Sequence, residues 1–339
     1  MVSIPKKIFS IFAVMLMTET SLFAQSQSEP VCCPPPCCGV SCCPGPYCRG
    51  PNCIDPYCNE FNIKGELLYW IGQLTGLQTA FGNTAVVTTT SPTTGFITTT
   101  ITETEVQPSF QWRPGFRVGA NYAYTCLLFE VDWTHYDGRA HFNRDAQHGY
   151  WKIQYDTLDF IVGRRCCVAP CFYFLPFVGL RGLRVHQSLS SNLDTEFVAG
   201  AVGTNTVFTY KHDKERIWGI GPELGVEADW YLGRLISLYG SFDVVTYYGN
   251  VNGSYDQVDT FPLNASVSNA HNHSRFNVIG TDLAIGLRYD KVWCIASEGL
   301  FTAKVGLEQH RIYEFSNLAS DGTLSLDGAN LMLDLGYRY

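Results

Sequence analysis

Two stretches of this sequence alternate between apolar and polar residues for about a dozen positions each. The first, FQWRPGFRVGANY, occupies residues 110–122, and the second, WGIGPELGVEADWY, occupies residues 218–231. A period of two residues is the pattern of a β-strand, and both stretches are longer than the usual strand of about five or six residues. Large apolar side chains form one face, while glycines and charged side chains form most of the other. This arrangement is typical of a wall between lipid and a polar interior, so it predicts membrane-spanning strands.

Ten segments of this kind follow one another along the chain, and their connections alternate between long and short. Long loops at one end and short turns at the other are typical of bacterial outer-membrane barrels. An open sheet edge in hydrocarbon would leave backbone groups unpaired, so the sheet must close. The sequence therefore predicts an all-β fold, a transmembrane antiparallel up-and-down β-barrel of about ten strands, with eight and twelve as the alternatives. The predicted strands are residues 61–74, 109–123, 126–136, 150–163, 172–186, 216–231, 235–248, 275–289, 298–312 and 323–339.

The beginning of the chain predicts the cellular compartment. Two lysines precede an apolar run that ends in small residues, which is the pattern of a secretory signal peptide. We therefore expect a signal peptide over residues 1–24, a disordered Cys- and Pro-rich periplasmic arm over residues 25–60, and a barrel over residues 61–339. An even number of strands places both termini on the periplasmic side of the outer membrane.

The end of the chain carries a local signal of its own. In LMLDLGYRY, apolar residues occupy alternate positions, and such a last strand ending on an aromatic residue is typical of the signal that outer-membrane assembly machinery recognises. The predicted assembly signal comprises Leu335, Tyr337 and Tyr339. Aromatic side chains near strand ends are expected at the level of the lipid headgroups, where amphipathic rings are favoured. They are Trp70, Tyr122, Trp133, Trp151, Trp230, Tyr248, Tyr289 and Tyr337.

The alternation also predicts which charged side chains point into the barrel. Folding the chain about a turn near Tyr124 would bring Arg117 close to Asp132. Two hypotheses follow: the charges pair with one another and plug a narrow lumen, or they line a water-filled pore that weakly prefers cations, because acids outnumber bases by eleven to eight. The predicted pore-lining residues are Arg113, Arg117, Glu130, Asp132, Arg181, Glu223, Glu227, Asp243, Arg288, Lys304, Glu308 and Asp334. The other charged residues on this predicted inward face are Lys64, Glu66, Lys152, Asp159, Asp229, Asp282 and Arg338.

Several blocks of sequence carry a family resemblance. They are ELLYWIGQ, FQWRPGFRVG, WKIQYDTLDFIVGR, FLPFVGLRG, IWGIGPELGVEADWYL and LFTAKVGLEQH. In this order they resemble the Legionella-type major outer membrane protein family, which includes members from chlamydia-related bacteria, over residues 66–339. The resemblance implies a barrel in the outer-membrane lipid that forms a pore for small hydrophilic solutes or ions and has no catalytic residues. The alternative is a structural or adhesive surface barrel with a plugged lumen.

Cysteines are concentrated in one strip near the N-terminus, VCCPPPCCGVSCCPGPYCRGPNCIDPYC, which resembles the cysteine-rich envelopes of chlamydia-like organisms. The remaining cysteines lie in or beside short links, which the barrel would place at its periplasmic rim. Because disulfides persist outside the cytoplasm, we expect bridges from the arm to this rim, to other copies of the chain, or to other cysteine-rich envelope proteins. An internal disulfide knot and a zinc site are the alternatives. The disulfide candidates are Cys32, Cys33, Cys37, Cys38, Cys42, Cys43, Cys48, Cys53, Cys58, Cys126, Cys166, Cys167, Cys171 and Cys294.

Other classes of function are disfavoured by the sequence. A net charge of −8 argues against nucleic-acid binding, and we expect neither a cofactor nor a bound metal. The histidines scatter over the predicted outer loops and strand ends without a catalytic spacing, and no G-x-S-x-G motif occurs, so we do not expect an enzyme. The threonine-rich stretch TAVVTTTSPTTGFITTTITET predicts an extended ribbon or an exposed loop that could contact a host or a phage.

Overall fold

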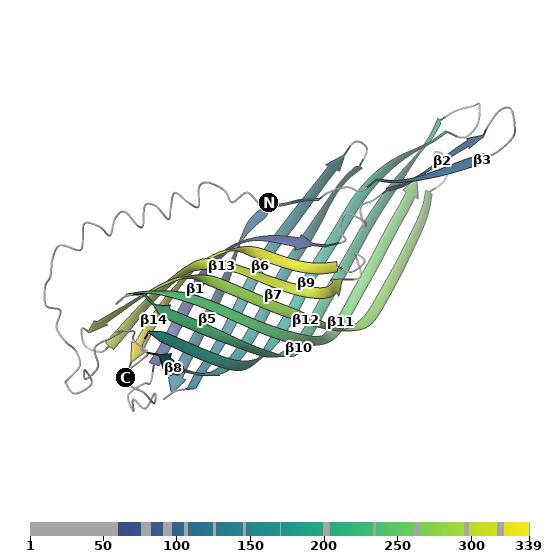
Figure 1. The fold of residues 1–339 in the computed structure, drawn as a ribbon. Helices are drawn as coiled ribbons and strands as arrows, with labels where there is room; N and C mark the ends of the chain where they lie inside the picture. Colours follow the sequence, from purple (N-terminus) through teal and green to yellow (C-terminus); the bar gives the residue numbers. More distant parts are fainter. Residues whose placement is uncertain are drawn as a thin grey trace, which may run out of the picture. The chain divides into compact units, whose positions relative to one another are not determined.

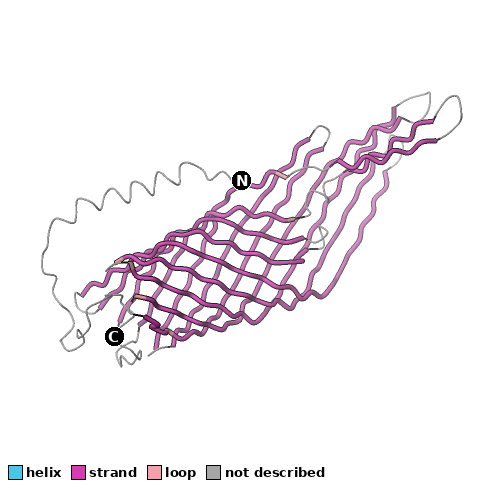
Figure 2. Tube along the Cα trace, viewed as in Figure 1, coloured by secondary structure: helices cyan, strands magenta, loops and turns pink. Residues whose placement is uncertain are grey.

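Nearly every described residue of the computed structural model lies in a β-strand (Figure 2). Among these residues, no helix is long and apolar enough to cross a membrane. The predicted signal peptide and the cysteine-rich strip lie outside the described part of the chain. The structure describes residues 60–75, 83–90, 97–104, 108–124, 127–144, 147–169, 171–198, 204–232, 235–260, 265–294, 298–316 and 322–338.

Ten of the strands form one closed antiparallel barrel (Figure 1). They are β1 (Glu60–Leu74), β5 (Trp112–Tyr124), β6 (Leu127–Arg144), β7 (Gln147–Arg164), β9 (Phe172–Val198), β10 (Thr204–Tyr231), β11 (Ile236–Thr260), β12 (Ala265–Cys294), β13 (Glu298–Ser316) and β14 (Gly322–Arg338). Each strand pairs with the next in this order, and β14 pairs with β1, so the sheet closes on itself. The predicted all-β barrel of about ten strands is confirmed.

Four short strands lie outside this ring of ten. The strands β2 (Asn83–Thr90) and β3 (Ile97–Thr104) form a separate two-stranded sheet within the threonine-rich stretch. This sheet agrees with the prediction of an extended ribbon there. The strand β8 (Cys166–Ala169) pairs with β9, and β4 (Ser109–Phe110) pairs with β6. The predicted strand over residues 109–123 is therefore interrupted, at Gln111.

This interruption changes the face on which Phe110 lies. The backbone N–H of Gln111 donates a hydrogen bond to the carbonyl of Arg139 at 3.1 Å. Phe110 then packs against the buried apolar residues inside the barrel, with its ring 6.1 Å from that of Trp151. The uninterrupted alternation had placed Phe110 on the lipid face, and this placement is wrong.

Both ends of the barrel chain lie at one rim, because Glu60 of β1 is paired with Arg338 of β14. We call this end of the barrel the termini rim. The short connections lie here, and they bring Cys166, Cys167 and Cys171 to this rim, together with Cys294 at the end of β12. Cys166 carries a free thiol, whereas Cys171 is disulfide-bonded. Cys126 and the nine cysteines of the N-terminal strip lie outside the described residues.

At the far rim, the strands are longer than the sequence predicts. Residues 187–215 were expected to form a loop, but β9 and β10 continue their antiparallel pairing up to Val198 and Thr204. Residues 249–274 belong in the same way to β11 and β12, and residues 137–149 belong largely to β6 and β7. Beyond the lipid both faces of a strand can meet water, so the apolar alternation that marks a membrane strand disappears there although the hydrogen-bonded ladder continues.

A belt of exposed apolar side chains surrounds the barrel wall between the two rims. Such a belt is what hydrocarbon requires of the outer face of a membrane barrel. Toward the far rim the outward side chains become polar, beginning with His135, Asp156 and Arg184 on β6, β7 and β9. Members of the belt on different strands include Ile63, Leu67, Phe160, Leu180, Leu224, Phe242, Leu283, Leu307 and Leu333.

The aromatic residues expected at the headgroup level divide into two groups. Trp133, Trp230, Tyr248 and Tyr337 are exposed on the outer surface, and Tyr122 and Tyr289 are partly exposed. Trp70 and Trp151 are instead completely buried inside the barrel, so their predicted placement is wrong. Trp70 lies on the same inward face of β1 as Lys64 and Glu66. Along the strand, this inward face is charged near the termini rim and apolar toward the far rim.

Candidate functional site in the barrel interior

The interior of the barrel contains two main layers of different chemistry, and a smaller buried apolar cluster of Ala123, Leu128, Tyr173, Leu175 and Tyr231 lies near the termini rim. The half nearer the termini rim holds buried ion pairs, which we call the charged layer. The half nearer the far rim holds a continuous cluster of buried apolar and aromatic residues, which we call the apolar layer. The apolar layer consists of Leu68, Trp70, Leu74, Tyr136, Ala140, Phe142, Trp151, Ile153, Tyr155, Leu183, Val185, Leu189, Ile217, Val245, Tyr247, Val251, Val278, Ile312, Phe315, Leu324 and Leu326.

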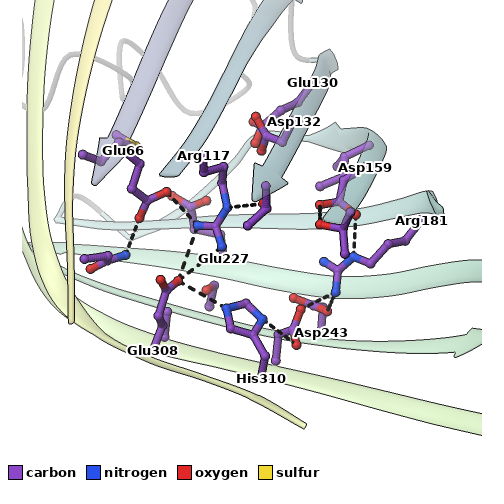
Figure 3. A pocket seen from close by; sticks show the side chains of 18 of the residues that line it. Glu66, Arg117, Glu130, Asp132, Asp159, Arg181, Glu227, Asp243, Glu308 and His310 are labelled. Atoms are coloured by element: carbon purple, nitrogen blue, oxygen red, sulfur yellow. Dashed lines mark hydrogen bonds and ion pairs between the residues drawn. The ribbon is translucent and has the colours of Figure 1, made fainter. Parts of the chain in front are cut away.

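Arg181 of β9 is the centre of one group of ion pairs in the charged layer (Figure 3). Its Nε atom donates to Asp159 of β7 at 2.5 Å, and its Nη2 atom donates to Glu223 of β10 at 2.7 Å. Its Nη1 atom contacts Asp282 of β12 and lies 3.5 Å from Asp243 of β11. One guanidinium thus joins carboxylates from four strands, and its fixed fork of N–H donors makes arginine suited to this position.

Arg117 of β5 is the centre of a second group (Figure 3). Its Nη1 atom lies 2.6 Å from Glu66 of β1 and 3.4 Å from Glu308 of β13. His310 connects the two groups, because it lies 2.8 Å from Asp282 and 3.5 Å from Glu308. These contacts reach across the lumen as well as between neighbouring strands.

Further ion pairs lie closer to the termini rim. Lys64 bridges Glu130 at 2.5 Å and Asp132 at 2.6 Å, so Asp132 pairs with Lys64 rather than with Arg117, the partner predicted from the turn. Lys304 pairs with Glu227 at 2.9 Å. The third pair in this region joins Arg288 to Asp229 at 3.0 Å and to Asp290 at 2.9 Å.

Two neighbouring cavities that share lining residues lie within the charged layer. The larger has a volume of about 150 Å³ and the smaller about 60 Å³, and both are lined by Lys64, Glu130, Glu227 and Lys304. The lining of the larger cavity contains nine carboxylates, four lysines or arginines, and His310. The interior around this cavity is therefore acidic, although its basic groups are all in ion pairs.

The apolar layer draws side chains from nine of the ten barrel strands. Trp70 packs against Tyr136 with ring centroids 5.5 Å apart, and the hydroxyl of Tyr136 accepts a hydrogen bond from the backbone of Gly72 at 2.9 Å. A small polar group is enclosed near this layer, where Gln187 donates to Glu215 at 2.5 Å. The apolar layer therefore fills the lumen on the far side of the charged layer.

The structure brings most of the predicted inward residues together. Arg117, Glu130, Asp132, Arg181, Glu223, Glu227, Asp243, Lys304 and Glu308 line the larger cavity, as do Lys64, Glu66, Asp159 and Asp282. The smaller cavity is lined by Arg288 and Asp334, among others, and Asp229 is buried beside Arg288.

Three of the predicted residues differ. Lys152 is exposed on the outer surface, because Trp151 and Ile153 are the inward residues of this part of β7, so its predicted inward position is wrong. Arg113 is half-buried and donates to Gln111 at 3.0 Å, outside both cavities. The side chain of Arg338 lies outside the described part of the structure.

Sequence reasoning missed two important residues of the interior. His310 was counted among the outer histidines, but it lies inside the barrel next to Glu308. His310 is an even number of residues away from Lys304 and Glu308 on β13, and this spacing could have predicted that its side chain points into the barrel. Trp70 was expected in the headgroup region, yet its indole N–H donates to Glu308 at 2.7 Å. Among the described side chains, no group of three or more histidines, cysteines or carboxylates has the arrangement of a metal site.

The closed ring of strands with an apolar belt outside and charges inside defines a transmembrane β-barrel. A family model described as Legionella pneumophila major outer membrane protein precursor matches residues 56–320. The chain therefore belongs to this family, as its sequence blocks suggested, and it is an outer-membrane barrel. No curated protein matches the chain in sequence.

Solved structures of other outer-membrane proteins share the barrel only distantly. The outer membrane protease OmpT from Escherichia coli is 10% identical with a TM-score of 0.40, over 83% of this chain and 97% of that chain. OprG from Pseudomonas aeruginosa is 10% identical with a TM-score of 0.28, over 84% and 97%. The toluene transporter TbuX from Ralstonia pickettii is 7% identical with a TM-score of 0.30, over 85% and 91%. Similarities this low give no indication of what the present chain does.

The Arg181 ion pairs predict a large effect on barrel stability. Arg181→Gln should lower the free energy of unfolding by about 3–5 kcal/mol, because four buried carboxylates lose their common partner. The measurement is urea unfolding of the barrel in lipid vesicles. The matched control is Arg311→Gln, since Arg311 is an exposed arginine on β13. The control should change the unfolding free energy by less than about 0.5 kcal/mol. Equal stability of Arg181→Gln and wild type would show that the Arg181 contacts do not support the fold.

Proposed function

We propose that this barrel is a channel of the outer membrane for small hydrophilic solutes or ions, with a preference for cations. The observation that carries the proposal is the acidic lining of the larger cavity, where nine carboxylates face four lysines or arginines. Such an excess of negative charge is costly to bury without water or cations nearby. A barrel that served only as a solid body would be at least as stable with well-packed apolar residues at these positions.

In the conformation described here, the apolar layer closes the far end of the charged layer. Passage therefore requires side chains such as Tyr136 and Trp70 to move, or the layer to open transiently. A small barrel of ten strands has little free cross-section, so conductance should be low compared with that of porins with about 16 to 18 strands. The lumen is closed because it is narrow and because aromatic side chains fill part of it.

The apolar layer also favours a second candidate function. A lumen filled by tightly packed residues from nine strands is consistent with a structural or adhesive surface barrel that passes nothing. In that case the long strands β9 to β12 would present the functional surface, and the charged layer would only fix the packing of the wall. The two candidates differ in a single measurable property, which is conductance.

The cysteines support a further part of the proposed function. The chain ends and the cysteines Cys166, Cys167, Cys171 and Cys294 lie at the same rim, and the N-terminal strip precedes Glu60 at that rim. With this rim in the periplasm, the strip joins the barrel to other copies or to other cysteine-rich envelope proteins through disulfides. The outer membrane then gains mechanical strength from covalent links.

Widening the apolar layer should increase conductance. Tyr136→Ala removes a completely buried ring from the lumen, so single-channel steps in a planar lipid bilayer should become larger or more frequent than in wild type. Trp133→Ala is the matched control, because Trp133 lies on the outer surface of the same strand. Silence from both the wild-type and the Tyr136→Ala barrel, each correctly folded, would exclude the channel and favour the structural function.

Removing one interior carboxylate should weaken the preference for cations. Asp334 lines the smaller cavity and forms no ion pair with any described side chain, so Asp334→Asn removes charge without breaking a pair. We expect the reversal potential in a salt gradient to move toward zero while the step size changes little. A shift toward stronger cation preference would show that the acidic interior does not set selectivity.

Disulfide cross-linking through the arm should be visible in whole cells. After free thiols are blocked, the wild-type protein should run as high-mass species on a non-reducing gel and as a monomer after reduction. A variant that lacks residues 31–58 should run as a monomer in both conditions while keeping a folded barrel. Wild-type protein that is monomeric without reductant would rule out intermolecular bridging.

A further inference from the structure

Beyond the apolar belt, five exposed basic residues gather on the outer surface of four adjacent strands. We call them the cationic patch. The strands β6, β7, β9 and β10 are neighbours in this order, and they lie side by side in the barrel wall (Figure 1). The cationic patch consists of Arg139 on β6, Lys152 on β7, Arg184 on β9, and Lys214 and Arg216 on β10.

The strand register places these side chains in separate groups, because Lys152 lies opposite Ser188, four residues from Arg184 along β9. Arg139 is directly opposite Lys152. Arg216 is directly opposite His186, so Arg184 is its diagonal neighbour at about 7–8 Å. Like charges that face each other across a strand pair are destabilising. The chain therefore keeps an unfavourable arrangement of charges on this surface, which an anion between them would relieve.

The carboxylates nearby neutralise the cationic patch only in part. Asp137, Asp156 and Asp256 lie on the same outer surface, and Asp156 is directly opposite Arg184. Asp137 and Asp156 also approach His135, at 3.7 Å and 2.7 Å respectively. Among the described side chains, no carboxylate forms an ion pair with any of the five bases. Arg184 has a polar neighbour in His186, to which its Nε atom donates at 3.1 Å. The surface thus carries five lysines or arginines against three carboxylates, Asp137, Asp156 and Asp256, so its charge is positive.

The height of the cationic patch along the barrel points to the lipid headgroups. Arg184 is directly opposite Trp218, which is 51% exposed on the outer surface. Exposed aromatic rings of this kind mark the boundary between hydrocarbon and headgroups. Arg184 therefore lies where the phosphate groups of a lipid would be, with the apolar belt below it in contact with acyl chains. Lys152, and Arg139 opposite it, lie four residues or about 13 Å farther along the strands toward the far rim.

The width of the cationic patch distinguishes between possible anions. Four neighbouring strands span about 14 Å, because adjacent strands lie about 4.8 Å apart. A single phosphate group can reach one pair of bases but not both pairs. We propose that the cationic patch binds a glycolipid that carries two phosphate groups on its sugar headgroup, one at Arg184 and Arg216 and the other at Arg139 and Lys152. This inference goes beyond the proposed channel and needs only that the far rim face outward.

Binding can be measured on the full chain in detergent micelles. The probe is purified diphosphorylated lipid A, titrated against the folded protein and detected by native mass spectrometry. Wild type should bind it, and the double variant Arg184→Gln, Arg216→Gln should bind at least about tenfold more weakly, since the loss of even one charge-assisted contact costs about a factor of ten. The matched control Arg311→Gln should bind like wild type, because Arg311 is exposed but lies opposite the neutral residues Thr281 and Ser325.

Each other outcome contradicts the proposal. Equal binding by the double variant and wild type would show that the cationic patch is not the site. Equal binding of dephosphorylated lipid A would show that only acyl chains are recognised, and equal binding of inorganic phosphate would show that the ligand is a free anion. Gel mobility with and without heating confirms that each variant is folded. The orientation is tested separately, by labelling intact cells that carry an epitope inserted in residues 199–203.

Discussion

The pairing of backbone groups in hydrocarbon is the constraint on which the rest of this structure depends. Each N–H and C=O at membrane depth must have a partner, and a sheet achieves this only when its first and last strands meet. Here β1 and β14 meet over fifteen residues, from Glu60 opposite Arg338 to Leu74 opposite Leu324. Closure leaves every strand with one face in lipid and one face in the lumen, so the alternation of the sequence follows directly from it.

Closure also encloses an interior that side chains must fill. A ring of ten strands encloses too little space for a wide channel and too much for backbone alone, so side chains must fill it. Near the termini rim the filling consists of arginines and lysines paired with carboxylates, and Arg181 and Arg117 each join carboxylates of different strands. Toward the far rim it consists of rings such as Trp70 and Tyr136. The indole of Trp70 connects the two layers through Glu308, so packing in one layer fixes the ion pairs of the other.

Sequence alternation was sufficient to predict the wall of the barrel but not everything attached to it. It predicted the ten strands, because lipid on one side and a lumen on the other leave a strict period of two. It failed where that condition ends, so the continuation of β9 to Val198 and of β10 from Thr204 was read as a loop. The alternation also failed where the lumen is apolar. There both faces of a strand carry apolar side chains, so the sequence does not show that Trp151 points into the barrel and not toward the lipid. Lys152 was misplaced for a different reason: strict alternation from Asp159 puts it on the outer face, and the inward prediction departed from that alternation. The pairing of Asp132 with Lys64 depends on side-chain reach across strands, which the sequence does not encode locally.

The distribution of charge between the two faces of the wall links the interior to the membrane. The chain carries a net charge of −8, yet the bases of the cationic patch face outward while the surplus of carboxylates lines the lumen. At headgroup level a base is attracted by lipid phosphates, and there the five bases of the cationic patch outnumber carboxylates such as Asp156. In the lumen the preference is reversed, because acidic groups there attract cations and are neutralised in part by Arg181 and Arg117. The same strands, alternating residue by residue, thus separate two opposite electrostatic requirements across the thickness of a single sheet.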